Sequence, residues 1–142
     1  MSKNFYGIIK SEIIDWENRK QEALNEAVKL KGLIPIIEEH YENRKPKQIH
    51  LGQNSSGWKF LFQWNDGKYY TNKLEFLNFI ETLDIVDEYG TPYTAGEFWN
   101  YIQNTDWNNK KAKSRTINQY SKDYFKDYII IDDMEFLNCE FS

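Results

Sequence analysis

The residues with the clearest chemical potential lie in one segment, His50-Leu51-Gly52-Gln53-Asn54-Ser55-Ser56-Gly57-Trp58. Glycines and serines in a hairpin loop expose backbone N–H groups and hydroxyls, and together these groups can form an anion-binding nest. Such a loop could serve a small-ligand or nucleotide-binding domain, or a weak hydrolase. The candidate ligand-binding residues of this segment are His50, Gly52, Ser55, Ser56, Gly57 and Lys59.

The same loop also fits a purely structural role. Both phosphate-loop patterns open a helix, whereas Trp58-Lys59-Phe60 continues as a strand, and neither GxGxxG nor GxxxxGK[ST] occurs. Glycines supply positive φ in such loops, and serine hydroxyls satisfy nearby backbone groups. We favour this structural interpretation and keep ligand binding as the alternative.

His50 could act as a general base toward Ser55 or Ser56, because a hydroxyl nucleophile needs a neighbouring base. The sequence has no GxSxG elbow and assigns no carboxylate to orient the imidazole. We therefore favour a partly buried, hydrogen-bonded strand histidine and assign no catalytic residue. A non-enzymatic protein is the expectation, with the weak hydrolase as its alternative.

Residue types that ligate metals are sparse. Cys139 is the single cysteine, which excludes an internal disulfide and a cysteine-rich zinc site, and His40 is the only other histidine. A hard cation would need converging oxygens, for which the acidic candidates are Asp84, Asp87, Glu88, Asp132, Asp133 and Glu135. Acidic runs are usually solvated surface, so we predict no metal and no cofactor.

A basic segment in the last third of the chain combines cations with a tryptophan. Such a mixture is typical of surfaces that grip single-stranded nucleic acid, although an exposed basic loop is the interpretation we favour. The candidate interaction residues of this segment are Trp107, Lys110, Lys111, Lys113 and Arg115.

Length and composition favour a single domain over residues 1–142. The chain is 40% hydrophobic and 17% aromatic, which is enough apolar surface for one core. Its formal net charge of −4 does not predict non-specific nucleic-acid binding. No apolar run approaches the roughly 18 residues of a membrane span, and no signal-peptide pattern begins the chain. We expect a cytoplasmic protein without a membrane partner; the sequence does not indicate an oligomeric state.

Alternation and aromatic content predict the strands. We expect strands over 4–10, 48–51 and 57–63, with a hairpin loop over 52–56. A turn at Asn65-Asp66-Gly67 should lead to a third antiparallel strand, because Asp-Gly supplies the positive φ that hairpin turns require. The C-terminal segment 124–141 regains strand character. Three aromatic residues are expected to share a core face, namely Trp58, Phe60 and Phe62.

Three- and four-residue spacing predicts the helices. One helix covers 13–31 with Ser11 as a possible cap and Gly32 after its end, and a second short helix opens at Pro35. A third begins at Thr71 or Asn72, and a fourth at the capping box of Thr94 and Glu97. The predicted fold is α+β: a small antiparallel sheet, built from hairpins around 48–70 and the C-terminal strand, packed against about three main helices.

Four pieces of sequence, taken in order, resemble a known group of proteins. They are Asn4-Phe5-Tyr6, the His50–Phe60 segment, Asp87-Glu88-Tyr89-Gly90 and Glu140-Phe141-Ser142. In this order they resemble small phage and prophage proteins of unassigned function that carry an HxGxxSxGWxF signature. Many proteins of that group place a CxxC pair before the HxG motif, suggestive of zinc. This chain has no cysteine there, so the resemblance implies no metal.

The resemblance implies a phage setting and offers no reaction. Together with the missing catalytic constellation, it leads us to expect a non-enzymatic protein that binds a host or phage macromolecule, for example as an inhibitor of a host-defence system. A protein partner is expected, and nucleic acid is left open at the basic segment. A small-ligand or nucleotide-binding domain using the Gly52–Gly57 loop is the alternative.

Overall fold

The computed structural model describes residues 2–28, 30–55, 58–104 and 128–141. Contacts within the chain divide it into two compact units. The first, which we call the sheet unit, comprises residues 1–7 and 49–142, and the second, the hairpin unit, comprises residues 8–48. The single domain expected over 1–142 stays a prediction.

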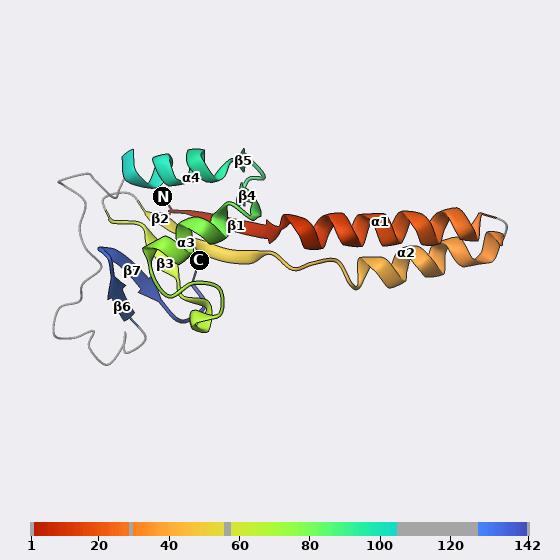
Figure 1. Cartoon of the computed structure of the whole chain (residues 1–142), viewed down its shortest axis with the longest axis horizontal. Helices are drawn as coiled ribbons and strands as arrows, with labels where there is room; N and C mark the ends of the chain where they lie inside the picture. Colours follow the sequence, from red (N-terminus) through yellow and green to blue (C-terminus); the bar gives the residue numbers. More distant parts are fainter. Residues whose placement is uncertain (1, 29, 56–57, 105–127, 142) are drawn as a thin grey trace. The chain divides into compact units, whose positions relative to one another are not determined.

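The sheet unit is built on a seven-stranded sheet in the order β5-β4-β1-β2-β3-β7-β6 (Figure 1). Its strands are β1 (Ser2–Ile9), β2 (Ile49–Ser55), β3 (Leu61–Gln63), β4 (Leu83–Asp87), β5 (Pro92–Tyr93), β6 (Tyr128–Ile131) and β7 (Met134–Leu137). The α+β class is confirmed. The sheet is mixed, however, because β3 pairs with β7 in parallel while β1–β2, β2–β3, β4–β5 and β6–β7 are antiparallel.

Two helices of the sheet unit begin at the predicted caps. In α3 (Lys73–Ile80) the Asn72 side chain accepts a hydrogen bond from the Glu75 backbone N–H at 2.8 Å. In α4 (Ala95–Ile102) the predicted capping box of Thr94 and Glu97 is present in full. Such caps satisfy N–H groups that the first helical turn leaves unpaired, and each contributes about 1 kcal/mol.

The core of the sheet unit is a stack of aromatic rings. The register places Phe5, Gly52, Phe62 and Phe136 side by side across four strands, on one face of the sheet. Helices α3 and α4 contact that face, since Phe76 lies 5.0 Å from Phe62 and Phe98 lies 5.1 Å from Phe5, between ring centroids. All of these phenylalanines are buried. Of the predicted stripe, Phe60 and Phe62 belong to this core, but Trp58 is 39% exposed.

The loop predicted over 52–56 and the third strand predicted after Asn65-Asp66-Gly67 are wrong where the structure describes them. Residues 52–55 do not form a loop but continue β2, because their backbone pairs with β1 and, at Gly52 and Gln53, also with β3. The Asn65-Asp66-Gly67 segment has the predicted positive φ at each residue, but it forms a 3-10 turn that leads toward α3. The next element after it is α3 and not a strand, and Tyr70 instead enters the core at 1% exposure.

The hairpin unit consists of α1 (Lys10–Ala27), a 3-10 turn (Lys31–Leu33) and α2 (Ile34–Glu42). The Trp16 indole N–H donates to the Tyr41 backbone oxygen at 2.6 Å and so ties α1 to α2. Pro35 lies in the first turn of α2 as predicted, whereas the cap of α1 is Ile9 and not Ser11. Gly32 lies in the 3-10 turn and does not end α1. Among the described residues, no helix combines the length and apolarity of a membrane span.

Candidate functional site

The predicted ligand-binding residues do not form the expected open loop where the structure describes them. Gly52 and Ser55 lie in β2, so their backbone groups face neighbouring strands and not a ligand. A Cβ at Gly52 would lie 2.3 Å from the Phe60 ring and 2.5 Å from the Leu61 backbone oxygen. Close packing therefore requires glycine here. Ser56 and Gly57 lie outside the described residues, and Lys59 is half-buried.

The alternative in which His50 acts as a base toward Ser55 does not fit the structure. The two residues are five positions apart along β2, and at about 3.3 Å per residue this corresponds to roughly 16 Å, far beyond hydrogen-bond reach. His50 is instead the partly buried, hydrogen-bonded strand histidine that the sequence favoured, since its Nε2 lies 2.9 Å from Asn4 Oδ1. The Ser55 hydroxyl is therefore too far from the His50 imidazole to be activated by it.

A bulge in β2 decides which face His50 occupies. Phe5 pairs with Gly52 but Tyr6 pairs with His50, so Leu51 is an extra residue in β2. In a regular strand, His50 and Gln53 would point to opposite faces, because they are three positions apart and side chains alternate along a strand. The bulge brings His50 to the face of Asn4 and Tyr6, away from the aromatic core. Bulges often re-aim a side chain beside a functional site.

His50 lines a pocket of about 570 Å³ on this face. The other lining residues are Tyr6, Gln63, Asn65, Glu140 and Phe141. The imidazole centroid lies 5.2 Å from that of Tyr6 and 4.8 Å from that of Phe141, so three rings are grouped at the pocket. We call this the His50 pocket. It joins the N-terminal strand, the HxG segment and the C-terminal Glu140-Phe141 pair.

A network of amides holds the polar side of the His50 pocket in place. The Asn65 side-chain amide donates to the backbone oxygen of His50 at 3.0 Å, and the Tyr70 hydroxyl donates to the backbone oxygen of Gln63 at 2.5 Å. Gln63 donates through Nε2 to the Cys139 backbone oxygen at 2.7 Å. The bonds of Asn65 with His50 and of Gln63 with Cys139 join residues 15 and 76 positions apart, so tertiary structure fixes the pocket wall.

Burial keeps the side chains of His50 and Tyr70 uncharged near neutral pH. Burial lowers the pKa of His50, although a hydrogen bond with the Gly52 backbone opposes this effect. Burial also raises the pKa of Tyr70, so its hydroxyl keeps the proton that it donates to Gln63. Neutral imidazole is a hydrogen-bonding and aromatic surface without net charge.

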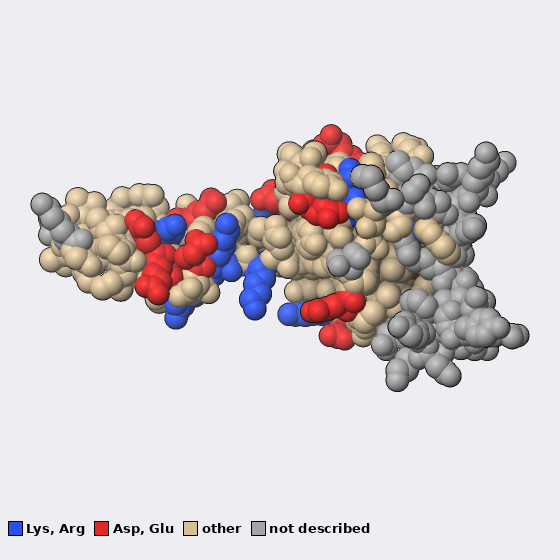
Figure 2. All heavy atoms as spheres, turned by 180° about the vertical axis from the view of Figure 1, so that it is seen from behind, with Lys and Arg blue, Asp and Glu red and all other residues tan. Residues whose placement is uncertain are grey.

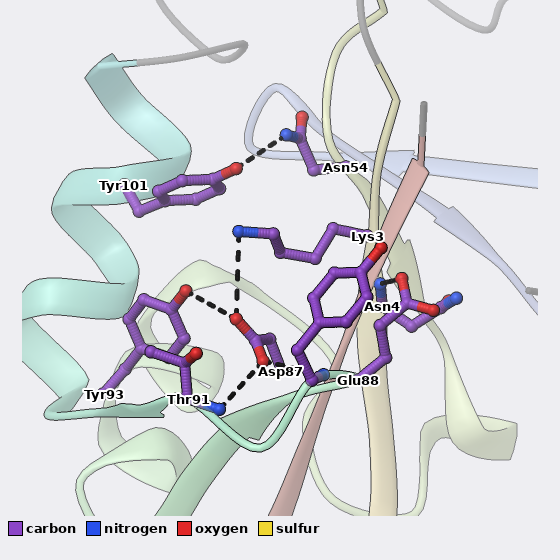
Figure 3. Close-up of polar contacts among 9 residues, drawn as sticks. Lys3, Asn4, Asn54, Asp87, Glu88, Thr91, Tyr93 and Tyr101 are labelled. Carbon is purple, nitrogen blue, oxygen red and sulfur yellow. Dashed lines mark hydrogen bonds and ion pairs between the residues drawn. The ribbon is translucent and has the colours of Figure 1, made fainter.

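A second polar cluster surrounds the carboxylate of Asp87, which is 3% exposed (Figure 3). Asp87 accepts hydrogen bonds from the Tyr89 and Thr91 backbone N–H groups and from the Tyr93 hydroxyl, each at 2.9 Å. Lys3 Nζ lies 3.8 Å away. Burial alone would raise the pKa of Asp87, but these hydrogen bonds and the Lys3 charge leave it lowered. The carboxylate is thus fully used in closing the turn between β4 and β5.

The acidic residues considered for a cation do not converge. Asp132 and Asp133 form the turn between β6 and β7, and Asp132 accepts from the Lys73 backbone N–H at 3.1 Å. Glu135 is buried and accepts a hydrogen bond from Tyr128. Among the residues described, no group of three or more His, Cys, Asp and Glu side chains could hold a metal ion. The basic candidates Trp107, Lys110, Lys111, Lys113 and Arg115 lie outside the described residues.

The hairpin unit presents an apolar surface at its end. Four side chains there are exposed: Val28 by 64%, Leu30 by 58%, Leu33 by 41% and Ile36 by 61%. We call these four residues the hairpin tip. On the face shown in Figure 2, charged side chains gather over the middle of α1 and α2, and the described atoms of the tip are free of them.

Sequence reasoning named His50 but missed its companions. Tyr6 and Phe141 have no special spacing from His50, and their approach depends on strand pairing and on the course of the C-terminus. Comparisons with protein-family models, curated proteins and solved structures found no match. Two surfaces with distinct chemistry therefore stand out on geometry: the apolar hairpin tip and the His50 pocket.

Proposed function

We propose that this chain is a non-enzymatic phage protein that acts in the cytoplasm of an infected or lysogenic bacterium by binding a host or phage protein, for example as an inhibitor of a host-defence system. The contact surface in this proposal is the hairpin tip. The phage setting comes from the sequence resemblance, and the exposure of the tip is the observation that carries the binding role.

The hairpin tip stands out because exposed large apolar side chains of the described residues are concentrated there. Four of them lie within nine residues, from Val28 to Ile36, and each is more than two-fifths exposed. Contiguous exposed apolar patches on soluble proteins mark contact surfaces, whereas single exposed apolar residues need no explanation. A partner that covers the tip would remove its apolar area from water, and this transfer is favourable by about 25 cal/mol for each Å² buried.

The helices of the hairpin unit gain little from their own packing. Among the described residues of 8–48, Ala27 alone is buried. An isolated helix of nine residues, the length of α2, is marginal in water, and helices in proteins derive most of their stability from tertiary contacts. A partner that covers the tip would therefore stabilise the helical hairpin as well as bind it.

Charge favours a protein over a nucleic acid as the partner of this surface. Residues 8–48 contain eight acidic and eight basic residues and are therefore formally neutral. Nucleic-acid binding depends on cations that neutralise phosphates, and a neutral unit offers no excess of them. An apolar tip flanked by charges of both signs matches the usual protein interface, with its apolar centre and polar rim.

The test is affinity capture from infected host cells followed by reconstitution with purified components. The tip variant is Leu30→Ser/Ile36→Ser, and its matched control is Leu74→Ser/Tyr89→Ser, which removes two side chains of similar exposure (69% and 68%) from the sheet unit. We expect the wild type and the control to capture one defined protein. The tip variant should bind the purified protein at least tenfold more weakly.

Two outcomes contradict the proposal. If no protein is enriched over an unrelated bait of similar charge, the binding role fails. If the purified partner binds the tip variant and the wild type equally, the binding role stands and the hairpin tip is not its surface. Circular dichroism of each variant establishes that the helices persist, because the substituted side chains are exposed and should not be needed for folding.

A further inference from the structure

The His50 pocket has a lining that selects the charge of its occupant. Its described walls combine two six-membered aromatic rings, an imidazole, two amides and the carboxylate of Glu140. Neither lysine nor arginine is among these lining residues. The formal charge of the lining is therefore negative, and three of its six residues carry aromatic rings. Its volume of about 570 Å³ is within the roughly 300–1,000 Å³ of small-molecule pockets.

The hydrogen-bonding groups of the pocket leave acceptors for a ligand. Asn65 Nδ2 donates to the backbone oxygens of His50 and Gln63, and because backbone oxygens only accept, this fixes which end of the Asn65 amide is nitrogen. Asn65 Oδ1 accepts no hydrogen bond from the described residues. Together with the Glu140 carboxylate, it offers oxygen atoms to an occupant that carries N–H groups.

The rings offer the complementary aromatic surface. The ring centroids of Tyr6 and Phe141 lie 5.2 and 4.8 Å from that of the His50 imidazole. Aromatic faces attract cations through their quadrupoles, most strongly where water is partly excluded. His50 does not oppose a cation near neutral pH, since burial lowers its pKa and keeps it uncharged.

We propose that the His50 pocket binds an alkylammonium group, with Glu140 balancing its charge and Tyr6 and Phe141 contacting its methylene or methyl groups. Asn65 Oδ1 accepts a hydrogen bond when the ammonium group carries an N–H. This site is independent of the hairpin tip, because all its lining residues belong to the sheet unit. The ammonium group can belong to a free amine or to a lysine side chain of a peptide, and both present the same chemistry.

The experiment follows the amide and side-chain NMR signals of the full chain during titration with four probes. Butylammonium and choline supply a primary and a quaternary ammonium group. The alcohol 3,3-dimethylbutan-1-ol has the shape of choline without its charge. A lysine blocked at both backbone ends represents the peptide source. We expect the ammonium probes to shift the Asn65 side-chain signals, and the neutral alcohol to leave them in place.

Two variants locate the binding site. Glu140→Gln removes the charge at an exposed position and should weaken ammonium binding about tenfold, as expected for losing a charge-assisted contact. Asp84→Asn removes an equal charge from an exposed residue of the sheet unit outside the pocket, and should bind like the wild type. Phe141→Leu should weaken choline binding by removing an aromatic face. If that variant unfolds, Glu140→Gln decides alone.

The titrations distinguish the two sources of the ammonium group and can also refute the proposal. Binding of blocked lysine as strong as that of butylammonium assigns a peptide source, and binding of the small amines alone assigns a free amine; either supports the proposal. It is overturned if none of the ammonium probes moves the Asn65 signals, if the neutral alcohol binds as well as choline, or if Glu140→Gln binds like the wild type. The capture experiment on the hairpin tip is unaffected by any of these results.

Discussion

At the scale of single residues, one bulge in β2 determines the surroundings of both Gly52 and His50. The bulge at Leu51 turns His50 toward Asn4, and it also leaves Gly52 facing the aromatic core beneath Phe60. A side chain at position 52 would have to displace a buried ring and a backbone oxygen. The HxG spacing thus has a structural reason in the bulge, apart from any ligand that the pocket binds.

Gly52→Ala should therefore lower the free energy of unfolding by about 1–3 kcal/mol, the usual range for overpacking a core. Gly96→Ala is the matched control, because a Cβ at Gly96 meets nothing within 4 Å and alanine favours the helix in which it lies. Urea unfolding of both variants measures the difference. Equal effects of the two substitutions would refute the packing role of Gly52.

His50 should also make stability depend on pH. Its pKa in the folded protein is below its ordinary value of 6.5, so below pH 6.5 the unfolded chain takes up the proton first. The free energy of unfolding should fall as the pH drops from 6.5 toward the folded pKa, and then level off. Titratable neighbours at the pocket are Tyr6 and Glu140.

Urea unfolding at pH 7 and pH 5 tests this, with His50→Gln as the comparison. The variant should lose less stability than the wild type over this interval. The carboxylates with lowered pKa do not interfere, because their contributions are lost only below about their ordinary values of 3.8 and 4.5. An identical loss in both proteins would contradict a buried, neutral His50.

At the scale of elements, the turn between β4 and β5 depends on Asp87. Its carboxylate is the acceptor for two backbone N–H groups and for Tyr93, and it lies beside Lys3 of β1. It therefore links the turn between β4 and β5 to Tyr93 of β5 and to Lys3 of β1 (Figure 3). Burial of a charged group is tolerated here because hydrogen bonds replace the lost water.

Asp87→Asn should lower the free energy of unfolding by about 1–3 kcal/mol, because the amide cannot accept all these bonds without burying unpaired N–H groups. Asp84→Asn, at an exposed position of β4, should change it by less than about 0.5 kcal/mol. Because the pKa of Asp87 is lowered, its contribution is complete above its ordinary 3.8 and is lost as the pH falls through the folded value. A wild-type-like Asp87→Asn at pH 7 would show that the cluster is not stabilising.

Local signals predicted the elements better than their arrangement. The caps at Asn72 and Thr94, the strand near the N-terminus and the burial of Phe60 and Phe62 depend on near neighbours, and the structure confirms them. The strand predicted over 57–63 is shorter, because β3 covers only Leu61–Gln63 and its three residues are all buried. The parallel pairing of β3 with β7 joins residues more than 70 positions apart, and no local pattern specifies it. Pairing with β1 also extends β2 through Ser55, where the sequence predicted a loop, and this pairing depends on residues about 50 positions away.

At the scale of the whole molecule, two units divide the features of the chain. The sheet unit contains the aromatic core, the His50 pocket and the Asp87 cluster, whereas the hairpin unit contributes an exposed apolar tip and one buried residue among those described. A unit with little core of its own and an apolar end is suited to contact another protein. This division is the basis of the proposed binding role.

Hydrogen exchange of the chain, free and bound to the purified partner, tests that role most directly. Covering the hairpin tip should slow the exchange of backbone amides across 28–36 and, by stabilising the helices, along α1 and α2. Amides of β1–β3 in the sheet unit serve as the internal reference and should not change. If exchange slows only in the sheet unit, and residues 28–36 exchange as in the free protein, the hairpin tip is not the binding surface and the proposed role is contradicted.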